Sequence, residues 1–100
     1  MATLTKALAR IAAATSSATL YTVPASTTTV VTNIVVTNSA ATAATFTITL
    51  DGIDLFKTVA IAANSTAMMD LKQVLATTKI IAGFASAITV SFHISGVEIS

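Results

Sequence analysis

The sequence predicts an all-β protein, a single antiparallel β-sandwich of about seven or eight strands with a short N-terminal helix or arm. Two observations carry this prediction. Apolar residues alternate with Thr and Ser through most of the 100 residues, which is the period-2 pattern of strands with one dry face. Turn-forming residues interrupt this pattern about every ten residues, the strand spacing of a sandwich. Two topologies stay open, a jelly roll and an immunoglobulin-like sandwich.

The chain divides into an N-terminal arm or helix with its linker, residues 1–18, and a β-sandwich domain, residues 19–100. Leu4, Leu8 and Ile11 have the i, i+4, i+7 spacing of a helical stripe. The N-terminal segment is therefore expected either to pack as a helix on its own domain or to order as an arm against a neighbouring subunit.

The first half of the domain contains three expected strands. Leu20–Val23 is a short strand ended by Pro24, which cannot donate to a ladder. Thr27–Asn38 carries β-branched residues on both faces, so we expect a central strand that is covered at least partly on each face. Thr45–Leu50 alternates cleanly. Its expected inward residues are Phe46, Ile48 and Leu50.

A hairpin is expected next, because both residues of the Asp51-Gly52 pair accept a positive φ. The return strand covers residues 53–61, and a turn at residues 62–66 leads to a strand over residues 67–71. Residues 70–78 are ambiguous, and a single helical turn is expected there from the spacing of Leu71, Val74 and Leu75.

Two further strands complete the predicted sandwich, Lys79–Phe84 and Ala87–Ser95. The last strand alternates again, and Val97 and Ile99 extend it beyond Gly96. Its expected inward residues are Ile88, Val90, Phe92 and Ile94.

Composition excludes several classes of function. The chain is 54% hydrophobic, with five Lys or Arg, four Asp or Glu and no Cys. Five scattered cations do not form a nucleic-acid-binding stripe, and no apolar run reaches the ~18–20 residues of a membrane-spanning helix. Lys6 and Arg10 interrupt any signal-peptide core, so synthesis in a cytoplasm is expected. Low surface charge protects weakly against association, which favours a part of an assembly whose strand edges are covered by neighbouring subunits.

Few residues are candidates for chemistry. His93, between Ser91 and Ser95 on the same strand face, would need a nearby acid to support catalysis. Asp51 and Asp54 flank a turn but lack the spacing of a calcium loop. The glycosylation sequon Asn64-Ser65-Thr66 is a weak pattern, and Met68-Met69 is expected to fill the core. We therefore expect no catalytic, metal-binding or cofactor-binding residue and no cofactor.

Six segments carry a resemblance through their order and spacing, and they are Leu20–Val31, Ile34–Asn38, Ala43–Ile48, Ile61–Thr66, Val90–Phe92 and Ser95–Ile99. Together they resemble small structural proteins of tailed-bacteriophage virions. The resemblance covers roughly residues 20–99. It implies a β-sandwich virion component that decorates the capsid or belongs to a tail or fibre. The Ala-rich N-terminus departs from that pattern, and so do residues 70–78, which lack a Gly-rich turn.

These observations lead to one main hypothesis and two others. The main hypothesis is a capsid decoration (cement) protein, a homotrimer made in the host cytoplasm that binds the major capsid protein, with neither nucleic acid nor membrane as a partner. A tail or tail-fibre module that binds a host surface is the alternative. A small hydrolase using His93 is the third. The residues expected at the interface are Leu4, Leu8, Ile11 and Tyr21.

Overall fold

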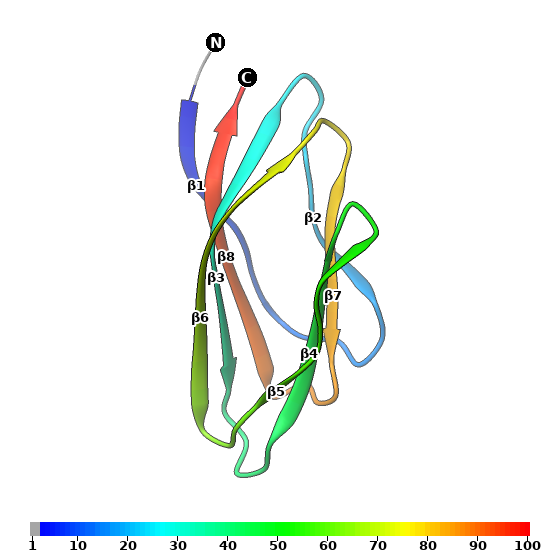
Figure 1. Ribbon diagram of the computed structural model, residues 1–100, viewed down its shortest axis with the longest axis vertical. Helices are drawn as coiled ribbons and strands as arrows, with labels where there is room; N and C mark the ends of the chain where they lie inside the picture. Colours follow the sequence, from blue (N-terminus) through cyan, green and yellow to red (C-terminus); the bar gives the residue numbers. More distant parts are fainter. Residues whose placement is uncertain (1–2) are drawn as a thin grey trace.

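The computed structural model describes residues 3–100, which form eight strands in two four-stranded sheets (Figure 1). All pairings are antiparallel. No helix that could cross a membrane occurs within residues 3–100. The strands are β1 (Thr3–Ala12), β2 (Ala18–Thr22), β3 (Thr28–Asn38), β4 (Ala44–Leu50), β5 (Ile53–Ile61), β6 (Ser65–Leu75), β7 (Ile80–Ala85) and β8 (Val90–Ile99).

The topology is that of a jelly roll. The strand orders are β1-β8-β3-β6 in one sheet and β2-β7-β4-β5 in the other. The chain is thus one long hairpin, in which β1 pairs with β8, β2 with β7, β3 with β6 and β4 with β5, rolled so that alternate pairs fall in opposite sheets. This order confirms the expected sandwich and decides between the two topologies that the sequence left open.

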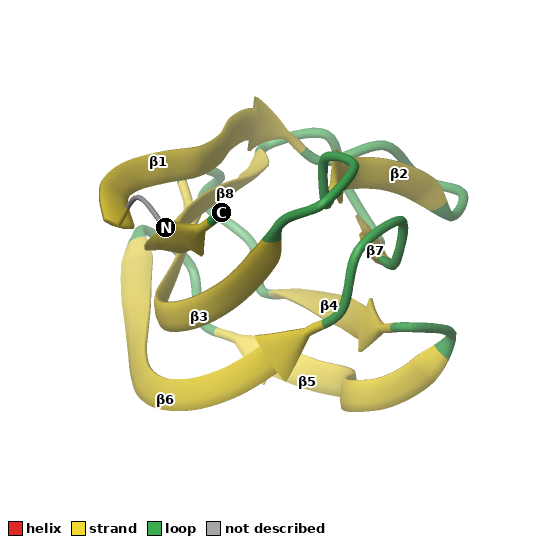
Figure 2. Ribbon diagram, turned by 90° about the horizontal axis from the view of Figure 1, so that it is seen from above, coloured by secondary structure: helices red, strands yellow, loops and turns green. Residues whose placement is uncertain are grey.

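The core lies between the two sheets and consists of the inward residues of the alternating strands (Figure 2). The inward assignments for β4 are confirmed, as are those of Val90, Phe92 and Ile94 on β8. Ile88 was expected to point inward as well, but it is 70% exposed. It precedes β8 in the loop, where the alternation of a strand no longer applies.

The predicted hairpin at Asp51-Gly52 is confirmed between β4 and β5. Asp51 has φ 54° and Gly52 has φ 76°, the two positive values of a type I′ turn. The turn follows directly from the residue pair.

The expected N-terminal helix is wrong, because residues 3–12 form β1, which pairs with β8 along its length. Residues 1 and 2 lie outside the described part of the chain. An isolated helix of about 12 residues is marginal in water. Pairing with β8 supplies ladder hydrogen bonds and places Leu8 in the core, so tertiary contacts override the helical spacing.

The helical turn expected within residues 70–78 is also wrong, because β6 continues to Leu75. Leu71 packs against the core and Leu75 is buried, whereas Val74 points outward and is 68% exposed. A register shift on β6 sets two residues, Leu71 and Lys72, opposite the single Thr32 of β3. The apolar spacing that suggested a helix comes from a strand with apolar residues on both faces, Leu71 and Leu75 inward and Val74 outward.

The four edge strands are β1, β6, β2 and β5, and each pairs with its neighbour through a register irregularity. Six of the nine charged residues also lie on three of these strands. Bulges and charges both discourage the pairing of a free edge with another chain. The charged edge residues are Lys6, Arg10, Asp54, Lys57, Asp70 and Lys72.

Candidate interaction surface

Four loops gather at one end of the sandwich, opposite the end where the described chain begins and finishes (Figure 1). They are residues 13–17, 39–43, 62–64 and 86–89. Their residue types are Ala, Ser, Thr, Asn and Ile, with no charged side chain. We call these four loops the uncharged loop end.

Asn38, the last residue of β3, holds three of these loops together. Its side chain is fully buried. The Nδ2 group donates to the carbonyl oxygens of Thr42, at 2.9 Å, and Ala62, at 3.3 Å. The Oδ1 atom accepts from the Ala40 amide, at 3.1 Å, and from the Thr89 hydroxyl, at 3.3 Å. One amide side chain therefore links the β3–β4, β5–β6 and β7–β8 connections.

Backbone hydrogen bonds tie the same loops to each other. The Asn64 amide donates to the Ala40 carbonyl at 2.9 Å, and the Ser39 amide donates to the Thr89 carbonyl at 3.2 Å. These bonds satisfy loop backbone groups internally and fix their relative positions. The uncharged loop end is therefore an ordered surface.

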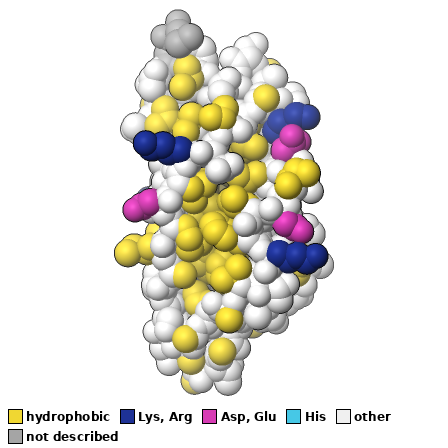
Figure 3. Space-filling model, in the orientation of Figure 1, with side chains coloured by type: hydrophobic (Ala, Val, Ile, Leu, Met, Phe, Trp, Pro, Cys, Tyr) yellow, Lys and Arg dark blue, Asp and Glu magenta, His cyan; other side chains and the backbone are white. Residues whose placement is uncertain are grey.

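The uncharged loop end presents methyl and hydroxyl groups, with one large apolar side chain, Ile88, that is 70% exposed. In Figure 3 the lower part of the visible face shows no charged side chains, and the charges lie higher on the molecule. The contacts that such a surface offers are apolar contacts and neutral hydrogen bonds, and not ion pairs.

We expect Asn38→Ala to lower the free energy of unfolding by about 2–3 kcal/mol, because buried hydrogen-bonding groups of three loops lose their partner. Urea denaturation measures this loss. Asn33→Ala is the matched control, since Asn33 makes an exposed bond to Asp70 at 3.0 Å. Its expected loss is below about 1 kcal/mol, and equal losses in the two variants would contradict the role given to Asn38.

A polar cluster joins the two sheets near the opposite end. The Tyr21 hydroxyl of β2 donates to the Glu98 carboxylate of β8 and lies 2.9 Å from the Thr29 hydroxyl of β3. The Lys6 ammonium of β1 is 3.4 Å from Glu98. Burial raises the pKa of Tyr21 to about 12, and the bond to Glu98 adds to the rise because it holds the phenol proton. Tyr21, expected at an interface, is buried and works as a link between the sheets.

This cluster predicts a loss of stability at alkaline pH. The folded pKa of Tyr21 is about 12, above the unfolded value of about 10. The native state therefore holds its proton more tightly, and this contribution is complete below pH 10 and disappears as the pH rises through 12. The slope should reach about −1.4 kcal/mol per pH unit. Denaturation between pH 9 and 12 tests it against Tyr21→Phe, which should lack this component.

The other expected interface residues share the inner side of β1 but differ in exposure. Leu8 is buried, whereas Leu4 and Ile11 are 56% and 46% exposed. Ile11 is opposite the buried Phe92, so it lies on the inner side of the sheet at its edge. Their spacing therefore reflects a partly covered edge strand.

The other sequence candidates are dispersed over the surface. His93 is exposed on β8, between Arg10 of β1 and Val35 of β3. Asp51 lies 3.6 Å from Lys79, and Asp54 lies 3.8 Å from Lys57. Within residues 3–100 no group of three potential metal ligands occurs. The sequon begins at the exposed turn residue Asn64, and Met68 is exposed while Met69 packs against the core.

The side of the sandwich between β5 and β6 is open. Half-buried Leu55, Phe56 and Met69 pack against the core there, and Figure 3 shows an apolar stripe along this face. A solvent-open hollow of about 420 Å³ lies at the bulge of β6. Its lining residues are Thr32, Asp70, Leu71 and Lys72.

The fold and these surfaces define a jelly-roll β-sandwich with an ordered, uncharged loop end. No protein-family model and no curated protein sequence matches the chain. Sequence reasoning missed Asn38, because a single Asn at the end of a strand gives no signal that three loops will converge on it.

Proposed function

We propose that the protein is a structural protein of a bacteriophage virion that decorates the capsid and binds the major capsid protein. The uncharged loop end carries this proposal. Asn38 fixes its loops, and Ile88 stands exposed upon it. The resemblance of residues 20–99 to small virion proteins supports the same role.

The mechanism would be mechanical. Each copy buries the loop end against the capsid through apolar and neutral hydrogen-bonded contacts, which are insensitive to salt because they contain no ion pair. Many copies acting together raise the work needed to open the shell. The protein is made in the host cytoplasm and resides in the virion. The homotrimer expected from the sequence stays a prediction, and the oligomeric state measured in solution tests it.

Quantitative mass spectrometry of purified virions tests the location. Hundreds of copies relative to the major capsid protein support decoration of the lattice. A few dozen copies or fewer would overturn it in favour of a tail or tail-fibre module. A complete absence from the virion would reject both roles.

A pair of matched variants tests the surface. Ile88→Asp places a charge on the uncharged loop end, whereas Ile53→Asp places the same charge near the opposite end. The two side chains have nearly equal exposure, 70% and 71%, so each variant should fold. We expect Ile88→Asp to abolish binding to undecorated capsids and Ile53→Asp to preserve it. Equal binding by both variants would reject the loop end as the docking surface.

A further inference from the structure

No other element of residues 3–100 lies over the outer face of the β1-β8-β3-β6 sheet (Figure 2). This face carries apolar side chains. On β3 the neighbours of Val30 and of Val35 are fully buried, so these two valines point outward. Val30 pairs with Val97 and Val74, and Val35 pairs with Met68. Met68 and Val74 are 75% and 68% exposed. β3 was expected to be covered at least partly on each face. The second sheet covers its inner face, and Val30 and Val35 on its outer face are half-buried. We call this surface the outer sheet face.

Charged side chains on the outer sheet face lie at its two edges, Arg10 on β1 and both Asp70 and Lys72 on β6. Arg10 is on edge strand β1, in register with His93, Val35 and Met68 across the sheet. Asp70 is on edge strand β6, two residues beyond Met68. Within residues 3–100 neither Arg10 nor Asp70 takes part in an ion pair. Between them, β8 and β3 carry only neutral and apolar side chains on this face, apart from His93.

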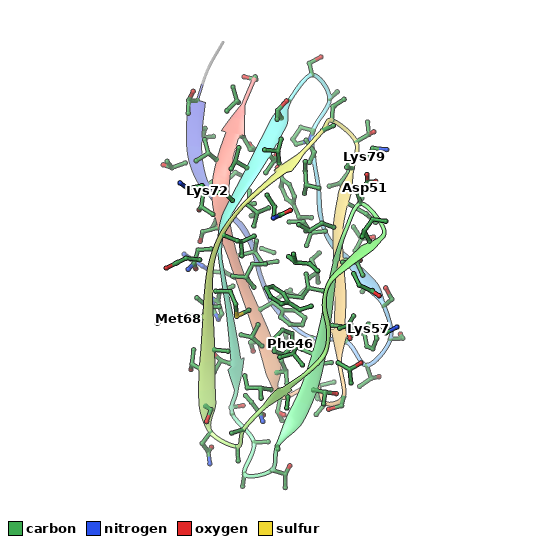
Figure 4. All side chains as sticks on the ribbon, in the orientation of Figure 1. Phe46, Asp51, Lys57, Met68, Lys72 and Lys79 are labelled. Atoms are coloured by element: carbon green, nitrogen blue, oxygen red, sulfur yellow. The ribbon has the colours of Figure 1, made fainter. Side chains whose placement is uncertain are left out.

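We propose that two copies of the chain pack through their outer sheet faces about a two-fold axis parallel to the strands. This axis places β1 of each copy over β6 of the other, so the apolar centres face each other. Arg10 of one copy then stands over Met68 of the second copy, within side-chain reach of Asp70 of the second copy. Lys72 lies farther along β6 from that level (Figure 4). Two symmetric ion pairs frame the apolar contact.

The positions of Arg10 and Asp70 favour this symmetry. A two-fold axis across the strands would stack β1 on β1 and β6 on β6, so Arg10 of one copy could not meet Asp70 of the other. The axis parallel to the strands brings these opposite charges together. The bulges and charges of the edge strands also oppose edge-to-edge pairing, which leaves the face as the contact.

The size of the face sets the expected strength. Four strands spaced about 4.8 Å apart and about ten residues long cover roughly 600 Å² per copy. The total of about 1,200 Å² is at the lower limit of specific interfaces. The dimer should therefore depend on concentration.

Sedimentation equilibrium over a concentration series tests the proposal on the full chain. We expect a monomer–dimer equilibrium that Arg10→Glu and Asp70→Arg each weaken at least tenfold. The double variant R10E/D70R restores opposite charges and should recover dimerisation. Lys57→Glu, on the other sheet, is the control and should have no effect. Circular dichroism confirms that each variant is folded.

Three results would overturn the two-fold pair. They are a monomer at all concentrations, a trimer, or a double variant that dimerises as weakly as the single variants. These results do not depend on the capsid. A failure to dimerise therefore leaves the virion copy number as an independent test of the proposed function, and a low copy number leaves the dimer standing.

Discussion

Replacing Gly96 with Ala should be among the most damaging single changes in the protein, with an expected loss of about 3 kcal/mol or more in the free energy of unfolding. A Cβ atom at this position would overlap the backbone carbonyl oxygen of Val30 and lie 2.9 Å from Leu8 Cδ1. Overpacking a core typically costs about 1–3 kcal/mol when side chains can move aside. Here the obstacle is backbone, so β3 must shift relative to β8.

Gly96 lies where three strands come together irregularly. It pairs with Lys6 of β1 and Val31 of β3, and the registers of both neighbours shift within two residues of it. The bulges bring the Val30 backbone and the Leu8 side chain close to Gly96. Only a hydrogen atom fits in place of a side chain there. The measurement is chemical denaturation of Gly96→Ala and of Gly52→Ala.

Gly52→Ala is the contrasting variant because its cause of strain is different. Gly52 has φ +76°, but a Cβ there would meet nothing within 4 Å. The expected loss is about 1–2 kcal/mol, the cost of a left-handed conformation for an L-residue. A loss at Gly96 no larger than that at Gly52 would show that the strands yield more easily than their packing indicates.

The parts of the fold that the sequence predicted are those in which a local pattern determines the structure. Thr45–Leu50 alternates without interruption, and Asp51-Gly52 can form a tight turn with positive φ at both positions. The predictions of this strand and this turn were correct because neither depends on a contact with a distant part of the chain. The pattern at β3 also showed that it would be a central strand, which the order of the sheet confirms.

The errors occur where long-range pairing decides the conformation. Leu4, Leu8 and Ile11 match a helix, yet β8, more than 80 residues away along the chain, recruits this segment as a strand. On β6, Leu71 and Leu75 are four residues apart and both point inward, whereas Val74 lies on the outer face. Apolar residues on both faces of a strand can therefore match helical spacing, and nothing local distinguishes the two cases.

The candidate surface was less predictable than the fold. The low charge indicated a protein that belongs to an assembly. It did not indicate which end of the sandwich would be uncharged, because the four loops are separated along the chain. Asn38 gains its partners, such as Thr42 and Ala62, only when those loops converge. Tyr21 was expected at an interface, and its burial depends on Glu98 near the far end of the chain.

Replacing Phe46 with Ala should lower the free energy of unfolding by about 3–5 kcal/mol, as expected for a buried aromatic side chain. Phe46 points into the space between the sheets (Figure 4) and is 1% exposed. Its ring packs edge-to-face against Phe56 of its own sheet and Phe92 of the other, each with centroids 6.2 Å apart. Removing the ring therefore breaks contacts within one sheet and between the two.

The comparison with Phe84→Ala decides whether this aromatic contact holds the sandwich together. Phe84 is half-buried and pairs with Thr47 on the outer side of the β2-β7-β4-β5 sheet, the sheet of Phe46 itself. Its removal therefore opens no cavity between the sheets, and the loss should be about 1–2 kcal/mol. Urea denaturation of both variants gives the difference. A domain of this size is stabilised by only about 5–15 kcal/mol, so Phe46→Ala should bring the chain close to unfolding at 37 °C. Similar losses in the two variants would mean that the sheets are joined mainly through the Tyr21 cluster and the aliphatic residues, and not through the three rings.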